Sequence, residues 1–285
     1  NEGTSNERTG IMEANKIKGE AKSVVLDNGA ELTYCELGEG NQEVLVSGAF
    51  YFHTFMPVLE HLAQRYHVYG VVMRFDGPAD ELEPDGSIHW GRQWGKDVYD
   101  FTQKMGLEKF HYVGKCHGTI PGWYLVKNHP EVLDTFASFY LAPHIKGQTA
   151  NSWFELMGQG LEKMMSVAMR KPEGLKAKME EMAAIGDSAQ SPAVPKYASA
   201  PEKIWDSVEE CDEALKSLTV PVGYCFGTID PLLQDYWDSN LYAIMNTKGA
   251  RTVILEGECH LMELDCPDRV AAEVFAFIDE SRKGY

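Results

Sequence analysis

The residues with the clearest chemical potential lie in segment 114–118, which reads Gly-Lys-Cys-His-Gly between a β-like run and a helix-like run. Glycines on both sides of the cysteine fit a sharp strand-to-helix turn, because the turn strains the central residue and flanking side chains would clash. Such a turn, called a nucleophile elbow, exposes the central side chain above a helix N-terminus. The N–H groups there lower the pKa of a thiol and stabilise an oxyanion. The pattern therefore predicts Cys116 as a nucleophile.

Two further polar residues follow later β-like runs. Asp230 comes after the seventh of these runs and His260 after the eighth. A histidine can take the proton of a thiol, and an aspartate can fix the tautomer of that histidine and stabilise its charge. Each residue also has a structural alternative: Cys116 as a buried thiol, Asp230 as a helix N-cap, and His260 as a surface histidine. Glu258 is an alternative candidate for the acid.

Other elements must position these residues. Near-continuous apolar runs alternate with amphipathic stretches, which is typical of a parallel sheet covered by helices on both faces. Asn28-Gly29 between the first two runs indicates a hairpin turn. The predicted strands are 23–27, 31–36, 43–48, 67–75, 109–114, 135–141, 220–226 and 251–255. The predicted helices beside them are 54–65, 90–105, 119–128, 232–247 and 268–281.

The alternation stops between residues 144 and 218, where no segment resembles a strand. Helices are expected there at about 151–170, 173–184 and 201–217. Six of the twelve methionines lie between 157 and 182. They fit either the core of an ordinary helical hairpin or an adaptable apolar wall over a ligand pocket.

The elbow, followed in order by an acid and a histidine, resembles the α/β-hydrolase fold superfamily, and specifically its members with a helical cap. The elbow usually holds serine in that family, and cysteine in a minority such as dienelactone hydrolase. The resemblance implies an α/β fold with a mostly parallel eight-stranded sheet, helices on both faces, and a helical cap inserted after the sixth strand. The domains are then a flexible tail at 1–20, a core at 21–143 and 219–285, and a cap at 144–218.

The same resemblance implies a catalytic triad of Cys116, Asp230 and His260. His260 would take the thiol proton, and attack on a carbonyl would give an oxyanion and then an acyl-thioester that water hydrolyses. A thiolate suits activated acyl groups such as lactones, enol esters and thioesters. The haloalkane dehalogenase and epoxide hydrolase reactions of this fold need a carboxylate nucleophile, so Cys116 argues against both.

An oxyanion hole needs two N–H donors, and the resemblance implies that one is the backbone amide of His117. The second donor comes from the loop after the third strand, which reads Ser-Gly-Ala-Phe-Tyr-Phe-His at 47–53. This loop has the glycine of the family but lacks the histidine before it. The Ala49 amide is the expected donor and the Phe50 amide its alternative. The expected substrate-pocket residues are Phe50, Phe52, His53, Trp153 and Met157.

Three functions fit these residues. The first is hydrolysis of an ester, a lactone or a C–C bond next to a carbonyl in an apolar small molecule. The second is acyl transfer from the same thioester, and the third is ligand binding without catalysis on a hydrolase scaffold. Two origins of Cys116 also stay open, a natural nucleophile or an engineered replacement of serine.

The composition excludes other classes of protein. The chain has 285 residues and a formal net charge of −17, which repels nucleic acid and anionic lipid. No apolar run reaches the ~18 residues of a membrane span, and the polar start has no signal-peptide core. The six cysteines show neither C-x-x-C nor zinc-site spacing. We therefore expect a cytoplasmic protein with a small-molecule substrate, no nucleic-acid or membrane partner, no metal and no cofactor. A homodimer is left open.

Overall fold

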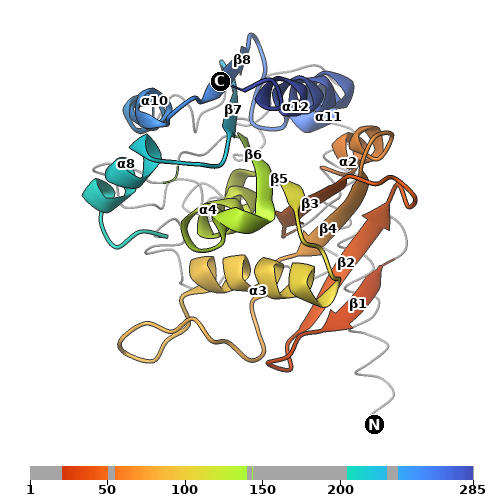
Figure 1. Cartoon of the computed structure of the whole chain (residues 1–285), viewed down its shortest axis with the longest axis vertical. Coiled ribbons are helices and arrows are strands. Elements are labelled where there is room, and N and C mark those ends of the chain that lie inside the picture. Colours follow the sequence, from red (N-terminus) through yellow and green to blue (C-terminus); the bar gives the residue numbers. More distant parts are fainter. Residues whose placement is uncertain (1–20, 51–54, 140–142, 144–203, 230–236, 285) are drawn as a thin grey trace, which may run out of the picture.

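A twisted sheet lies at the centre of the molecule (Figure 1). The computed structural model describes residues 21–50, 55–139, 143, 204–229 and 237–284. The strands are β1 (Lys22–Val25), β2 (Glu31–Leu37), β3 (Val44–Ala49), β4 (His67–Val72), β5 (Phe110–Lys115), β6 (Leu133–Phe139), β7 (Val222–Gly227) and β8 (Arg251–Leu255). These eight strands lie in the order β1-β2-β4-β3-β5-β6-β7-β8. The β1–β2 and β2–β4 pairs are antiparallel and the others are parallel, so β5 with its elbow lies near the middle.

Helices cover both faces of the sheet (Figure 1). One face is covered by α3 (Trp90–Lys104), α4 (Thr119–Asn128), α8 (Val208–Lys216) and α10 (Trp237–Asn246). The opposite face is covered by α2 (Met56–Leu62), α11 (Met262–Asp265) and α12 (Pro267–Ser281). Two short 3-10 helices, η1 (Cys116–Gly118) and η2 (Pro130–Val132), complete the described elements. This layering is the one that near-continuous apolar strands require.

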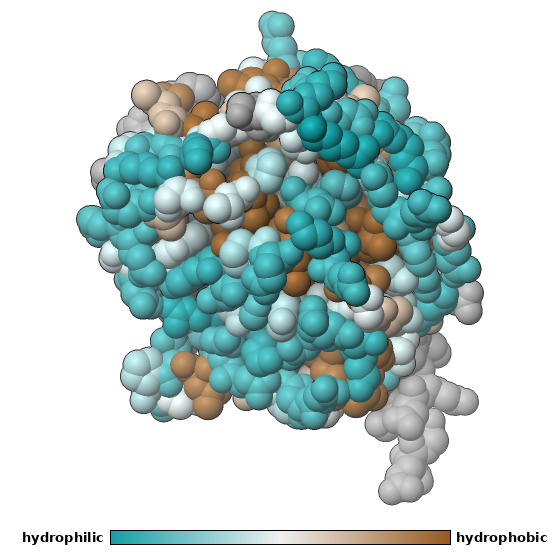
Figure 2. Space-filling model, viewed as in Figure 1, coloured by the Kyte–Doolittle hydropathy of each residue, from teal (hydrophilic) through white to brown (hydrophobic). Residues whose placement is uncertain are grey.

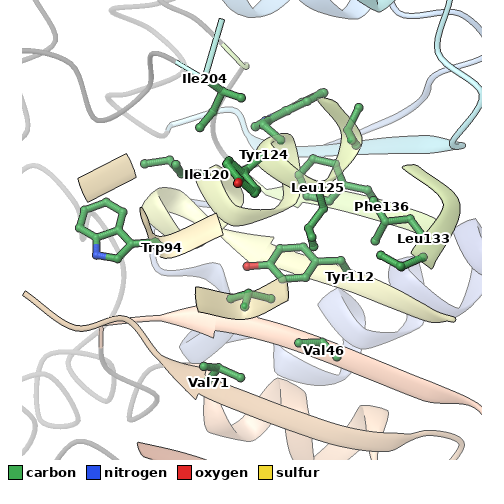
Figure 3. Packing of buried hydrophobic residues seen from close by; sticks show 14 of the residues in the cluster. Val46, Val71, Trp94, Tyr112, Ile120, Tyr124, Leu125, Leu133, Phe136 and Ile204 are labelled. Atoms are coloured by element: carbon green, nitrogen blue, oxygen red, sulfur yellow. The ribbon is translucent and has the colours of Figure 1, made fainter. Parts of the chain in front are cut away.

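Two hydrophobic clusters hold the layers together, one on each face. Side chains alternate between the faces of a strand, so Tyr112 and Val113 on β5 enter different clusters. Figure 3 shows Tyr112 in the first cluster, among Val46, Leu125 and Phe136. The helices contribute residues at helical spacing, as α3 does with Trp90, Trp94, Val98 and Phe101. Both faces of the central strands are therefore buried, which fixes the position of the elbow.

The predicted fold class is confirmed. All eight predicted strands are present and differ from the expected bounds by a few residues, and the Asn28-Gly29 hairpin joins β1 to β2. Helix α4 has the predicted bounds. The sequence did not predict η1 or α11, because elements of three and four residues are too short for a periodic pattern.

The predicted cap is described only over its last part. Helix α8 lies inside the helix expected at 201–217. Ile204, Trp205, Cys211 and Leu215 join the first hydrophobic cluster, so this part packs against the sheet domain. Residues 1–20 and 144–203, with the expected tail and the other cap helices, lie outside the described residues. The division into core, cap and tail stays a prediction.

The described surface is largely polar on the face seen in Figure 2, with hydrophobic side chains visible between the polar ones. Among the described helices, none combines the length and the apolar character that a membrane span needs. All six cysteines lie in the described ranges, and none of them forms a disulfide.

A buried ion pair ties the loop after β4 to α3. Arg74 Nε and Nη2 donate to the Asp97 carboxylate over 2.8 and 2.9 Å, and these side chains are 7% and 4% exposed. We expect Arg74→Leu to lower the free energy of unfolding by about 3 kcal/mol, because the Asp97 carboxylate then stays buried without its counter-charge. The control is Arg65→Leu, whose exposed partner is Asp279; its loss should stay below about 1 kcal/mol. Urea unfolding curves measure both, and equal losses would contradict the argument.

Candidate active site

Cys116 has the backbone conformation of a strained strand-to-helix turn. Its φ is 51°, the one positive value at a non-glycine residue in the described ranges. β5 ends just before it, and η1 and α4 follow it. A Cβ atom on Gly114 would lie 2.3 Å from the Gly118 carbonyl oxygen, and one on Gly118 would lie 2.1 Å from the Gly48 oxygen. Close backbone approach therefore requires glycine on both sides of the cysteine.

Two imidazoles act on the thiol of Cys116. The side chain of this cysteine is buried, and its Sγ lies 3.2 Å from His117 Nδ1. His260 is also buried, and its imidazole acts on the same thiol. Burial by itself raises the pKa of the Cys116 thiol. The charges and hydrogen bonds of His117 and His260 outweigh this effect and hold the pKa well below its ordinary value.

The thiol pKa values of four other cysteines are shifted in the opposite direction, upward. Burial raises the pKa of the Cys35 thiol to about 11. Burial likewise raises the pKa values of Cys211, Cys225 and Cys259. The Cys116 thiol is therefore set apart from these four by its two histidines, since all five side chains are buried.

The loop that leads to Asp230 is hydrogen-bonded to the loop that leads to His260. Ile229 donates its backbone N–H to the Glu258 carbonyl over 3.0 Å. The Gly257 amide donates to Thr228 Oγ1 over 2.8 Å. Asp230 itself lies outside the described residues. The chain thus brings the residue before Asp230 next to the segment that carries His260, and the role of Asp230 stays a prediction.

Glu258, the alternative acid, lies in a small polar cluster. Its carboxylate, that of Asp265 and the Cys266 sulfur offer ligand atoms within 4.8 Å of one another. Arg269 Nη1 lies 3.9 Å from Glu258 Oε1 and supplies positive charge there. A guanidinium at this distance competes with a metal cation for the same carboxylate, so the cluster gives no support to a metal site.

The end of β3 leads into the loop expected to carry the second oxyanion donor. The Gly48 amide donates to the Tyr112 hydroxyl over 3.1 Å, so it points toward β5. The Ala49 carbonyl accepts over 2.8 Å from the amide of Met73, the first residue after β4. β3 ends at Ala49, so the strand register does not extend to Phe50. The assignment of Ala49 as the donor, with Phe50 as its alternative, stays a prediction.

Tyr112 joins the end of β3 to the elbow, a role that the sequence did not indicate. Its buried hydroxyl accepts from the Gly48 amide and donates to the Gly118 carbonyl over 2.7 Å. Burial raises the pKa of this hydroxyl, which therefore keeps its proton for donation. The sequence predicts a tyrosine within an apolar strand to be an ordinary residue of the hydrophobic core, so no pattern could identify this contact.

A second contact joins the elbow to the segment after His260. Lys115 Nζ makes an ion pair with Glu263, and these side chains are 12% and 1% exposed. Glu263 lies three residues beyond His260, so the pair holds this segment against the elbow. The two charges lie 148 residues apart in the chain, and no spacing rule connects them.

One of the expected pocket residues lies in the described ranges. The half-buried ring of Phe50 has centroid distances of 5.5 Å to His117, 4.8 Å to Phe75 and 5.0 Å to Trp94. It therefore forms an aromatic wall beside the elbow. The other expected pocket residues lie outside the described ranges: Phe52, His53, Trp153 and Met157.

Solved structures with the same architecture include three enzymes. The enol-lactonase from Burkholderia xenovorans LB400 matches with a TM-score of 0.69 and 17% identity, over 90% of this chain and 100% of that chain. The 2-hydroxy-6-oxo-6-phenylhexa-2,4-dienoate hydrolase from Rhodococcus sp. strain RHA1 matches with a TM-score of 0.69 and 16% identity, over 91% of this chain and 100% of that chain. Naproxen esterase from Bacillus subtilis matches with a TM-score of 0.70 and 17% identity, over 96% of this chain and 95% of that chain.

No protein-family model matches the sequence. The structural similarity nevertheless extends over nine-tenths or more of this chain in all three cases. The chain has the α/β-hydrolase fold.

Proposed function

We propose that the protein is a hydrolase that uses Cys116 as its nucleophile. The observation that carries the proposal is a buried thiol on a strained elbow, which lies 3.2 Å from the His117 imidazole and has its pKa lowered by His117 and His260. A strained backbone and a strongly shifted pKa at one residue are features that concentrate at active sites. The reaction is cleavage of an ester, a lactone or a C–C bond next to a carbonyl, through an acyl-thioester.

The proposed mechanism uses the geometry of the elbow. His260 takes the thiol proton, and Asp230 orients His260 and stabilises its positive charge. The thiolate attacks the carbonyl carbon, and the carbonyl electron pair moves to the oxygen, which accepts from the backbone amides of His117 and Ala49. Collapse expels the leaving group, which takes the proton from His260. Water, deprotonated by the same imidazole, then hydrolyses the thioester.

The structural neighbours support this reaction class. The named proteins are a lactonase, a hydrolase of an oxo-dienoate and an esterase. Enol lactones suit a thiolate in particular, because an enolate leaving group needs less protonation than an alkoxide or a carbon leaving group. We further propose a small, largely apolar substrate, no added cofactor and a cytoplasmic location.

Trapping of the acyl-enzyme tests the proposal. The whole chain is mixed with a panel of aryl esters, enol lactones and meta-cleavage-type diketones, quenched in acid, and analysed by intact mass. We expect one acyl adduct, mapped to Cys116, that forms and decays as product appears. The adduct should be absent in Cys116→Ala and present in Cys259→Ala, which removes another buried thiol.

The same experiment distinguishes the alternatives. An adduct that decays only after addition of an alcohol, amine or thiol would indicate acyl transfer. If the wild type turns over a substrate without any adduct, and Cys116→Ala is equally active, then the nucleophile assignment is wrong. Ligand binding without adduct or turnover would indicate a binding protein.

A further inference from the structure

We infer that His117 is a catalytic residue through its side chain, in addition to its backbone amide. Its imidazole donates the Nδ1–H to the sulfur of Cys116 and stabilises the thiolate together with His260. The inference rests on the proposed function, since it describes how the same nucleophile is kept ionised. It goes beyond that proposal, because the oxyanion hole uses only the backbone of His117.

The position of the imidazole carries the inference. His117 Nδ1 lies 3.2 Å from Cys116 Sγ, which is a hydrogen-bonding distance for sulfur. The ring is buried, and the ring of Phe50 lies over it with a centroid distance of 5.5 Å and an interplanar angle of 33°. Cys116 and His117 are neighbours in η1, so few bonds separate the imidazole from the sulfur. The contact is therefore held by the backbone and by packing.

With two imidazoles, one can stabilise the thiolate while the other transfers the proton, two roles that a single histidine otherwise combines. A lone partner must hold the thiolate and also carry the proton that the leaving group needs. With two partners, the thiol proton goes to His260, while His117 keeps its own Nδ1 proton and donates only a hydrogen bond. When sulfur bonds to the carbonyl carbon, the carbonyl electron pair moves to oxygen, and His260 later protonates the leaving group. His117 therefore stabilises the resting thiolate without changing the proton balance.

Two histidines from different elements act on the Cys116 thiol. His117 lies on η1 and His260 in the loop after β8, and both lower the pKa of the thiol. Lys115 and Glu263, from β5 and α11, form an ion pair beside the elbow. The Phe50 ring, from the end of β3, packs against the imidazole of His117. The hydrogen bond to sulfur is therefore buried, and burial strengthens it.

The test measures ionisation of the thiol without any substrate. The rate of Cys116 alkylation by iodoacetamide, read by peptide mass, is followed against pH together with thiolate absorbance near 240 nm. The wild-type thiol should titrate well below the ordinary ~8.5. His117→Phe keeps an aromatic ring against Phe50 but removes the donor, and His117→Met removes both. Each should raise the apparent thiol pKa by about 1–2 units, the effect of one charge-assisted hydrogen bond.

A third variant separates the hydrogen bond from packing. His117→Asn keeps an N–H donor near the position of Nδ1 and should recover part of the shift. Titration of both His117→Phe and His117→Met at the wild-type pKa would overturn the inference, as would an Asn variant shifted as far as Phe. Failure of the proposed function is a different result, namely full turnover in Cys116→Ala. The thiol titration does not depend on turnover, so the two failures are distinguishable.

Discussion

Replacing Cys116 with alanine is expected to lower kcat on the order of 10⁴-fold or more for any substrate that the wild type hydrolyses. The variant loses the atom that forms the thioester, and no other described thiol shares its two imidazoles. Binding of the substrate should change little, because the oxyanion amides and the Phe50 wall remain. Steady-state rates with the substrate found by acyl trapping measure kcat and KM separately.

Four further variants test whether the loss in Cys116→Ala reflects the proposed triad. Cys116→Ser keeps a nucleophile of similar size but one that is not ionised at rest, so partial activity is expected. His260→Ala and Asp230→Asn should each lower kcat at least ~10²-fold, since they remove the proton acceptor and its orienting group. Cys259→Ala is the matched control and should retain the wild-type rate. Wild-type activity in Cys116→Ala would place the site elsewhere.

Gly118→Ala is expected to have the second largest effect. The added Cβ would lie 2.1 Å from the Gly48 carbonyl oxygen, a backbone atom within the central sheet. The elbow must therefore shift away from β3, which changes the spacing between the amides of His117 and Ala49, the expected oxyanion donors. Misplacement of one oxyanion donor costs about 10²–10³-fold in kcat. The forced shift should also lower the free energy of unfolding by about 1–3 kcal/mol.

Another glycine provides the control for Gly118. Gly86 has a φ of 83° and no heavy atom within 4 Å of an added Cβ. Gly86→Ala should therefore cost about 1–2 kcal/mol through its left-handed backbone alone and leave kcat unchanged. Urea unfolding and steady-state rates on both variants separate stability from catalysis. A wild-type kcat in Gly118→Ala would show that the contact between elbow and β3 does not set the oxyanion hole.

The sequence by itself determined the fold and the position of the elbow. Strands and helices follow from local apolar periodicity, and this is why the eight strands and α4 appear where they were predicted. The two glycines around Cys116 are equally local, because a sharp turn excludes larger side chains at those positions. The bounds of α2 and β6 differ by a few residues, since tertiary packing decides where the ends of an element fray.

The tertiary structure decided which groups meet at the elbow. The Tyr112 hydroxyl joins Gly48 to Gly118, and Lys115 pairs with Glu263 from a distant part of the chain. The spacing of the glycines predicts the turn, but the contact of the His117 ring with the sulfur depends on the direction of that side chain, which spacing does not give. Sequence periodicity reports which face of an element is apolar, whereas the direction of individual backbone and side-chain groups is set only when distant segments pack together.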